Sequence, residues 1–187
     1  MLVADATTGP ASAARVGAVH AQNVGSEDDA GNVSVAPFFP HGVVIVRGGN
    51  HDSAIPFGSS RREGETLICG IRPGETMFIG RPDAVSTQVA SSGDADSPGT
   101  VDISHSRSVF EVTGPSATNT LEKVCSLDWG DAMMPDGACG SASVAKISCD
   151  VIRADDGIRR RYLVICGRSW GQYLHESLLD AAAEFSA

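Results

Sequence analysis

A run of alternating apolar and polar side chains at residues 143–152 constrains the fold of this chain more than any other feature. One face of the expected strand carries four apolar side chains, Ala145, Ile147, Cys149 and Val151. The opposite face carries Lys146, Ser148 and Asp150. Turn residues follow at 155–157 (Asp-Asp-Gly), and residues 158–166 are predicted to form the return strand. Because side chains alternate along a strand, this hairpin buries one face and requires an antiparallel sheet covered on one side.

Shorter apolar runs and helical spacings extend this pattern over the rest of the chain. Further strands are expected at residues 42–46, 66–71, 75–79 and 107–113. Helices are expected to begin near Pro82, Pro115 and Trp170, the last with a capping box made by Ser169 and Gln172. This order predicts an α+β fold in which a mostly antiparallel sheet carries helices on one face. The hairpin and helix of the first half are expected to complete the sheet of the second half.

The first 40 residues differ in composition from the remainder. Residues 1–36 are rich in Ala, Gly, Ser, Asn and Asp, and they contain the acidic run Glu27-Asp28-Asp29 without apolar periodicity. Such a segment buries too little apolar area to offset the entropy lost on ordering. We therefore expect residues 1–40 to form an extended or disordered arm that orders only on a partner. Residues 41–187 are expected to form a single α+β domain.

Charge and hydropathy exclude several classes of partner. The chain has 23 acidic against 14 basic residues and a net charge of −9, whereas a phosphate backbone requires clustered Lys and Arg. Nucleic acid is therefore not an expected partner. No window of about 18 apolar residues occurs, so no contact with a membrane through a spanning helix is expected. Residues 1–15 lack the basic and apolar regions of a secretory signal, which favours a cytoplasmic location.

Residue types that bind metals or attack substrates are present, but not at the spacings that their chemistry requires. The five cysteines form no CxxC pair, so free buried thiols are expected. None of the five histidines lies four residues from another, which argues against a metal site. Gly48-Gly49 does not belong to a phosphate-binding loop, and no GxSxG nucleophile motif occurs. We therefore assign no catalytic, cofactor-binding or metal-ligating residue.

Three further features have two interpretations each. His41 and His51 flank a loop, where they either meet or remain separately solvated on the surface. The three arginines at 159–161 are expected to be solvated unless they face an acidic neighbour. The aromatic residues Trp129, Trp170 and Tyr173 either pack in a core or form an interface, where such residues are enriched.

One part of the sequence resembles a known family. Val101-Asp102-Ile103-Ser104-His105 is followed by the strand at 109–113, by Gly114-Pro115, by a helix through Leu121, and by Leu127-Asp128. This pattern resembles the folate-binding aminomethyltransferases, the T-protein of glycine cleavage and its relatives. Arg168-Ser169-Trp170, Tyr173-Leu174 and the segment 181–185 are most similar to the small gamma subunit of heterotetrameric sarcosine oxidase. Residues 71–80 also look like an earlier segment of the family, and the likeness covers residues 67–187.

This resemblance implies an aminomethyltransferase-subdomain-like fold and a non-catalytic structural gamma subunit that binds no cofactor. The complex would carry FAD, FMN, NAD and tetrahydrofolate on other subunits, with zinc as a further candidate. The chain would meet alpha, beta and delta subunits, and the alpha subunit directly through residues 67–90 and the aromatics between 129 and 173. The complex would oxidatively demethylate sarcosine or another N-methyl amino acid. The one-carbon unit would pass to tetrahydrofolate or leave as formaldehyde, with hydrogen peroxide as a second product.

The chain departs from the aminomethyltransferases where those enzymes carry their chemistry. The family has a Gly-Gly pair before adjacent aspartates, whereas residues 146–150 are Lys-Ile-Ser-Cys-Asp and contain one carboxylate. We expect Asp150 to be an exposed, solvated side chain and not a catalytic group. Two alternatives remain open. One is a stand-alone tetrahydrofolate-binding or aminomethyltransferase-like module, and the other is an adaptor domain in a different N-demethylating complex.

Overall fold

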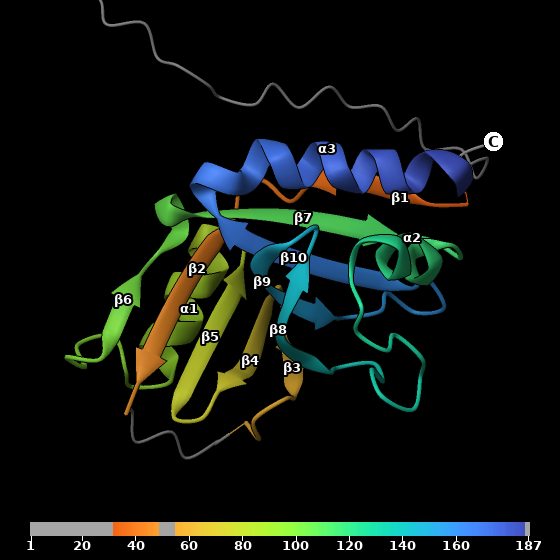
Figure 1. The fold of residues 1–187 in the computed structure, drawn as a ribbon. Helices are drawn as coiled ribbons and strands as arrows, with labels where there is room; N and C mark the ends of the chain where they lie inside the picture. Colours follow the sequence, from red (N-terminus) through yellow and green to blue (C-terminus); the bar gives the residue numbers. More distant parts are fainter. Residues whose placement is uncertain (1–31, 49–54, 186–187) are drawn as a thin grey trace, which may run out of the picture.

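The computed structural model describes residues 32–48 and 55–185, which form two five-stranded sheets and three α-helices (Figure 1). The strands are β1 (Ser34–Pro37), β2 (Gly42–Arg47), β3 (Ser60–Glu63), β4 (Thr66–Arg72), β5 (Glu75–Gly80), β6 (Thr100–Asp102), β7 (Arg107–Thr113), β8 (Cys139–Val144), β9 (Ile147–Arg153) and β10 (Arg161–Gly167). The helices are α1 (Pro82–Ser91), α2 (Ala117–Val124) and α3 (Gly171–Ala182), and short 3₁₀ turns lie at Ser104–Ser106, Arg168–Trp170 and Ala183–Phe185.

Both sheets are antiparallel between neighbouring strands. The first sheet has the order β1-β7-β10-β9-β8, and the second has the order β3-β4-β5-β2-β6. All pairings within the named strands are antiparallel, which confirms the predicted class and sheet type. Hairpins connect β3 to β4, β4 to β5, β8 to β9 and β9 to β10, so half of the eight pairings join strands that follow each other in sequence.

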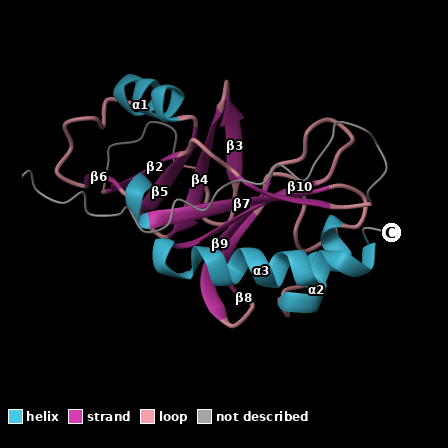
Figure 2. Ribbon diagram, turned by 90° about the horizontal axis from the view of Figure 1, so that it is seen from above, coloured by secondary structure: helices cyan, strands magenta, loops and turns pink. Residues whose placement is uncertain are grey.

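The two sheets pack face to face and the helices cover the outer faces, which gives four layers (Figure 2). Helix α1 covers the second sheet through Val85 and Val89. Helices α2 and α3 cover the first sheet, where Leu121, Leu174 and Leu178 are fully buried. Each sheet therefore carries helices on one face only. The expectation that both halves of the chain share one sheet is wrong, because the first half builds a sheet of its own.

The side-chain alternation of the strands divides their apolar residues between different cores. In β2, Val43 and Ile45 point into the core between the sheets, whereas Val44 and Val46 point toward α1. Strands that are covered on both faces appear in sequence as continuous apolar runs, which explains the Val-Val-Ile-Val stretch. Full burial of one Val, Ile or Leu side chain contributes about 1.5–3 kcal/mol. The apolar side chains between the sheets therefore stabilise the packing of one sheet on the other.

The alternating run at 143–152 contains a turn that its pattern does not indicate. Strand β8 ends at Val144 and β9 begins at Ile147, which lies opposite Val144 in the ladder. Between them, Ala145 and Lys146 have φ angles of 48° and 68°. Two consecutive positive φ values are typical of the type I′ turn, whose twist matches a two-residue hairpin. The prediction of one uninterrupted strand is wrong here because neither Ala nor Lys signals such a turn.

Four residues of the predicted N-terminal arm form a strand of the first sheet. Residues Ser34 to Pro37 form β1 and pair with β7, with Ser34 opposite Thr113 and Pro37 opposite Phe110. Val33 is buried in the core beneath α3. This part of the expected arm is an edge strand, which tolerates Pro37 because one of its sides has no ladder partner. Residues 1–31 lie outside the described part of the chain.

Three element starts differ by a few residues from their expected positions. Helix α2 begins two residues after Pro115, and β10 begins at Arg161 rather than at residue 158. Helix α3 begins at Gly171 after a 3₁₀ turn, without a side-chain capping bond from Ser169. The apolar faces of α2 and α3 are nevertheless those that the spacing of their apolar residues predicts. Among the described residues, no helix has both the length and the hydropathy needed to cross a membrane.

Candidate functional site

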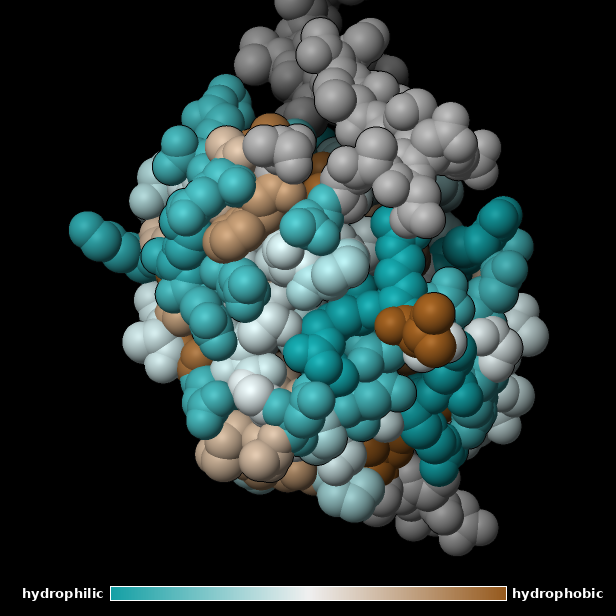
Figure 3. Space-filling view, turned by 90° about the vertical axis from the view of Figure 1, so that its right-hand side faces the viewer, coloured by the Kyte–Doolittle hydropathy of each residue, from teal (hydrophilic) through white to brown (hydrophobic). Residues whose placement is uncertain are grey.

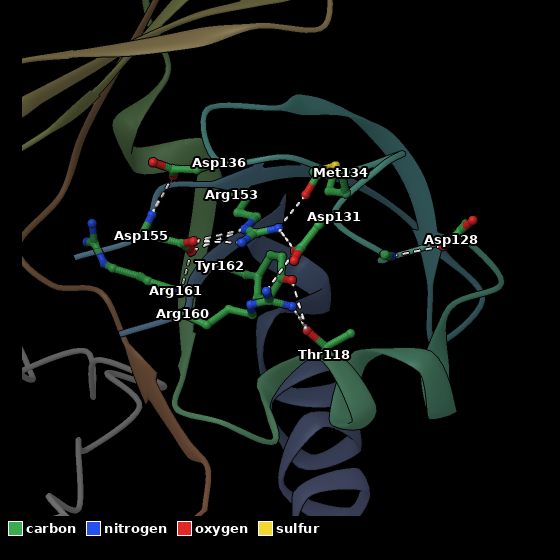
Figure 4. Close-up of polar contacts among 11 residues, drawn as sticks. Thr118, Asp128, Asp131, Met134, Asp136, Arg153, Asp155, Arg160, Arg161 and Tyr162 are labelled. Atoms are coloured by element: carbon green, nitrogen blue, oxygen red, sulfur yellow. Dashed lines mark hydrogen bonds and ion pairs between the residues drawn. The ribbon is translucent and has the colours of Figure 1, made fainter. Parts of the chain in front are cut away.

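The densest polar cluster in the described part of the chain surrounds Arg153, at the end of β9 (Figure 4). The Arg153 side chain is only 6% exposed. Its Nε and Nη2 donate to Asp155, with the Nη2 to Oδ2 distance at 2.8 Å. Its Nη1 donates to Asp131 Oδ1 at 2.6 Å and to the Met134 carbonyl at 2.7 Å. A buried charge is tolerated only when paired, and these contacts satisfy the guanidinium.

A second arginine extends this cluster to α2. Arg160 Nη2 donates to the same Asp131 oxygen at 2.7 Å, and Nη1 donates to Thr118 Oγ1 at 3.0 Å. Thr118 Oγ1 also lies 3.0 Å from the hydroxyl of Tyr162, which is buried in β10. Arg161 forms an ion pair with Glu111 on β7. Two of the three arginines of the predicted charge run thus meet acidic neighbours, which confirms that interpretation for Arg160 and Arg161.

The electrostatics of this cluster favour charged carboxylates. The hydrogen bond from Arg153 is the largest influence that lowers the pKa of Asp131. Burial opposes ionisation of Asp155, but the bonds from Arg153 and from the Arg161 N–H outweigh it and lower the pKa. The bonds to Asp155 in turn raise the pKa of Arg153. A general acid or base needs a pKa near the working pH, so these groups are suited to holding the loop between α2 and β8 and not to proton transfer.

A smaller ionic cluster links the two sheets. Arg72, at the end of β4, donates to Glu75 Oε1 at 2.8 Å and to Asp150 Oδ1 at 2.8 Å. Asp150 also accepts a bond of 2.7 Å from Ser141 Oγ, and Arg47 donates to Glu75 Oε2 at 2.7 Å. Burial disfavours the charged form of Glu75, yet the two arginines lower its pKa overall.

The position of Asp150 corrects the expectation of an exposed side chain. Asp150 is 5% exposed, because its face of β9 packs toward the second sheet and not toward water. A single-sheet fold would have left that face in solvent. The described structure shows no second acidic group adjacent to Asp150 in the chain, since its neighbours are Cys149 and Val151. Asp150 therefore has the surroundings of a structural ion-pair partner.

The Asp102-Ile103-Ser104-His105 segment forms the corner between β6 and β7. Ser104 donates through its backbone N–H and through Oγ to Asp102 Oδ1, at 2.8 and 2.6 Å. The Val43 N–H donates to Ser104 Oγ at 2.8 Å, which ties the corner to β2. The Ser104 hydroxyl lowers the pKa of Asp102. The residues of the family-like motif therefore act as a turn that fixes the sheet edge.

The His41 side chain faces three carbonyl oxygens near this corner. Its Nδ1 lies 2.9 Å from the Phe38 oxygen, and its Nε2 lies 3.2 Å from the Arg107 oxygen. His51 lies outside the described residues. No group of three or more His, Cys, Asp or Glu side chains within residues 32–48 and 55–185 is placed to hold a metal ion.

The three notable aromatic residues divide between core and surface. Trp129 is completely buried and meets Tyr162 edge to face, with ring centroids 5.3 Å apart. Trp170 is 54% exposed and Tyr173 is 46% exposed at the start of α3, with centroids 6.3 Å apart. The core interpretation therefore holds for Trp129. Trp170 and Tyr173 remain available as candidates for an interface.

Two open hollows lie on the described surface beside α1. They have volumes of about 280 Å³ each and lie side by side, with Glu63 and Gln88 lining both. Cavities that enclose small ligands usually have about 300–1,000 Å³, and these hollows also open to solvent. Seen from the right-hand side of Figure 1, the surface is mostly hydrophilic, with hydrophobic residues in separate patches (Figure 3).

Comparisons with known proteins match this geometry at the level of fold. Neither a known protein family nor a curated protein matches the sequence. A chain of the heterotetrameric sarcosine oxidase from Corynebacterium sp. U-96, in complex with pyrrole 2-carboxylate, aligns with a TM-score of 0.69 and 19% identity. The alignment covers 83% of this chain and 86% of that chain. The two chains share one fold.

A second solved structure is a larger enzyme of the same fold. The glycine cleavage system aminomethyltransferase T from Bartonella henselae aligns with a TM-score of 0.61 and 12% identity. The alignment covers 80% of this chain but 46% of that chain. This confirms the predicted aminomethyltransferase-like fold. The present chain corresponds to part of the transferase and to most of the sarcosine oxidase chain.

Proposed function

We propose that this chain is a structural gamma-type subunit of a heterotetrameric, sarcosine oxidase-like flavoenzyme complex. The observation that carries the proposal is the reciprocal coverage of 83% and 86% with a chain of such a heterotetramer. A transferase of which 46% aligns supports an independent folate enzyme less well, because its remaining part has no counterpart in this chain. The resemblance of Arg168-Ser169-Trp170 and the final helix to gamma subunits points in the same direction.

The chain itself is proposed to be non-catalytic. The buried Arg153 is paired with Asp155, and the buried Asp150 is paired with Arg72. The carboxylates around Arg153 are held ionised, which suits a scaffold more than an acid or base. The proposed complex demethylates sarcosine or another N-methyl amino acid. Its FAD, FMN, NAD and tetrahydrofolate, and zinc where present, are then carried by the alpha, beta and delta subunits.

Co-expression tests this proposal directly. The tagged chain is produced together with candidate alpha, beta and delta subunits from the same host, and the purified material is analysed by native mass spectrometry. We expect one copy of this chain in a four-subunit assembly that forms hydrogen peroxide when sarcosine or a related N-methyl amino acid is added. Omission of this chain should reduce the yield of assembled complex. Isolation of the tagged chain without any flavin-containing partner would contradict the proposal.

A titration tests the alternative that the chain is a stand-alone folate-binding module. The purified chain alone is titrated with tetrahydrofolate by isothermal calorimetry. We expect no binding heat, because the two hollows beside α1 are about 280 Å³ each and open to solvent. Tight binding by the isolated chain would favour an independent folate-dependent activity. Assembly with activity on a different N-methyl amine would instead identify an adaptor in a related complex.

A further inference from the structure

Four exposed side chains lie close to the point where α3 begins (Figure 1). Trp170 is 54% exposed and Tyr173 is 46% exposed. Arg168 is exposed in the 3₁₀ turn before the helix, and Lys146 is exposed in the turn between β8 and β9. We call these four residues the basic aromatic patch.

Short contacts hold the segments of this patch together. The Tyr173 hydroxyl donates to the Ala145 carbonyl oxygen at 3.1 Å, which places α3 beside the turn between β8 and β9. A Cβ on Gly171 would lie 2.4 Å from the Ser108 Oγ, so the start of α3 rests directly on β7. The rings of Trp170 and Tyr173 meet edge to face, with centroids 6.3 Å apart. The patch is therefore one continuous surface built from two segments of the chain.

The two cations of the patch have no acidic partner among the described residues. Neither Lys146 nor Arg168 belongs to an ion pair there. Arg168 instead donates to the His105 carbonyl oxygen at 3.3 Å. By contrast, Lys123, the only other lysine in the chain, forms an ion pair of 2.7 Å with Glu184. The patch is thus locally basic, although the chain carries a net charge of −9.

The carboxylates on either side of the patch bind within their own segments. Glu176, the first acidic residue of α3, accepts a hydrogen bond of 2.9 Å from Gln172. Asp102, in the corner next to β7, accepts bonds of 2.8 and 2.6 Å from Ser104. Within the part of the chain that the structure describes, no carboxylate therefore neutralises the patch.

We propose that the basic aromatic patch is a docking surface for an acidic segment of another subunit. Carboxylates of that segment pair with Arg168 and Lys146, while its apolar side chains pack on Trp170 and Tyr173. Arginine binds a carboxylate through two parallel N–H donors, and Trp, Tyr and Arg are the residues enriched among interface anchors. The inference rests on the proposed function, because it assigns the surface through which this chain meets its complex.

Charge also distinguishes the possible occupants of the patch. Two copies of this chain carry a net charge of −9 each, so long-range repulsion opposes their approach. An acidic segment on a different subunit is instead attracted to the two unpaired cations. Attraction between exposed charges increases the association rate and weakens as salt is added. A salt-dependent association rate is therefore the signature of this contact.

Cross-linking of the assembled complex tests the proposal with an internal control. The chain is co-expressed with candidate flavin-containing subunits, and the purified complex is treated with a water-soluble carbodiimide. This reagent joins a lysine amine directly to a neighbouring carboxylate as an amide. We expect amides between Lys146 and Asp or Glu side chains of another subunit, and none between Lys123 and another subunit. Mass spectrometry of the digested complex identifies the joined peptides.

Charge reversal supplies an independent measurement. We expect Arg168→Glu to associate with the remaining subunits at least about fivefold more slowly than the wild type at about 50 mM salt, and the difference to shrink at about 500 mM. Arg159→Glu is the matched control, because Arg159 is exposed in the turn before β10, at the opposite end of that strand from the patch. This control should associate at the wild-type rate.

The outcomes separate this inference from the proposed function. Assembly without an inter-subunit amide at Lys146 would overturn the inference alone, as would an amide from Lys146 only to this chain's own residues 1–31 or to a second copy. Equal slowing by Arg168→Glu and Arg159→Glu would also overturn it. If the wild-type chain assembles with no flavin-containing subunit, both proposals are wrong. The wild-type cross-link map decides the matter even if a variant fails to fold.

Discussion

Arg153 shows how one buried charge organises a long connection. Its donors reach Asp131 and the Met134 carbonyl in the loop between α2 and β8, and Asp155 in the next turn. The arginine lies at the end of a strand whose sequence gives no sign of the network. Its partners are separated from it by two to 22 positions and meet it only because the loop folds back over β9 and β10. No sequence motif indicates that the loop folds back in this way.

Replacement of Arg153 tests whether this network stabilises the loop. We expect Arg153→Met to lower the free energy of unfolding by about 3 kcal/mol, because it removes the guanidinium that pairs with Asp155 and donates to the Met134 carbonyl. Urea denaturation followed by circular dichroism measures the change. Arg160→Met is the matched control, and its effect should be much smaller because Asp131, its main partner, is 70% exposed. Equal losses in the two variants would contradict the assignment.

His175 makes folding stability depend on pH near neutrality. It stacks on Phe110 with centroids 5.2 Å apart, and burial lowers its pKa. Below about pH 6.5 the imidazole takes up a proton more readily in the unfolded chain than in the folded chain. The free energy of unfolding therefore decreases as the pH is lowered through this range. The His175→Phe variant should lose this component. The urea midpoints of the wild type and of the variant are measured at pH 7.5 and at pH 5.5. If the midpoint changes between the two pH values by the same amount in both proteins, His175 is not the source of the pH dependence.

At the scale of elements, long periodic segments were predictable and short or irregular ones were not. The strand β7 coincides with the expected range 107–113, and α1 begins at Pro82 as expected. Strands β3 and β6 were not among the expected strands, because runs of four and three residues carry no periodicity. Ser169 and Gln172 have the spacing of a capping box, but the 3₁₀ turn before α3 removes the geometry that the box requires.

The turn between β8 and β9 offers a stability prediction at this scale. Lys146 is exposed and has a φ of 68°, which costs a side chain with a Cβ about 1 kcal/mol. We expect Lys146→Gly to raise the free energy of unfolding by about 0.5–1 kcal/mol, since the type I′ turn favours glycine there. Chemical denaturation measures the gain. Lys146→Ala keeps the Cβ and should show no gain, so an equal gain in both variants would count against the turn strain.

At the scale of the whole molecule, the four-layer arrangement decides which residues are left for a partner. Several residues of the expected contact surface at 67–90 and among the aromatics are not accessible to a partner. Leu67, Ile79 and Trp129 are all buried. Trp170 and Tyr173 stay exposed beside each other at the start of α3. If the proposed complex forms, these rings are the part of the predicted contact that can reach another subunit.

A pair of surface variants tests this remaining contact. We expect Trp170→Ser to reduce co-purification of the proposed partner subunits at least about tenfold, since exposed aromatic anchors often contribute over about 1.4 kcal/mol to an interface. Thermal unfolding of the isolated variant should stay close to that of the wild type. Ile158→Ser, at a fully exposed apolar residue in the turn before β10, is the control and should leave assembly unchanged. Assembly that depends on Ile158 and not on Trp170 would place the interface elsewhere.

The sequence by itself determined the α+β class, most strand and helix positions, the free buried thiols and the likeness to aminomethyltransferases. These depend on local periodicity and on spacing within one element, which a single chain displays directly. Only the tertiary structure decided that there are two sheets and that Asp150 and Arg153 are buried. Those features depend on which faces pack together, because the same alternating strand can present its second face to water or to another sheet.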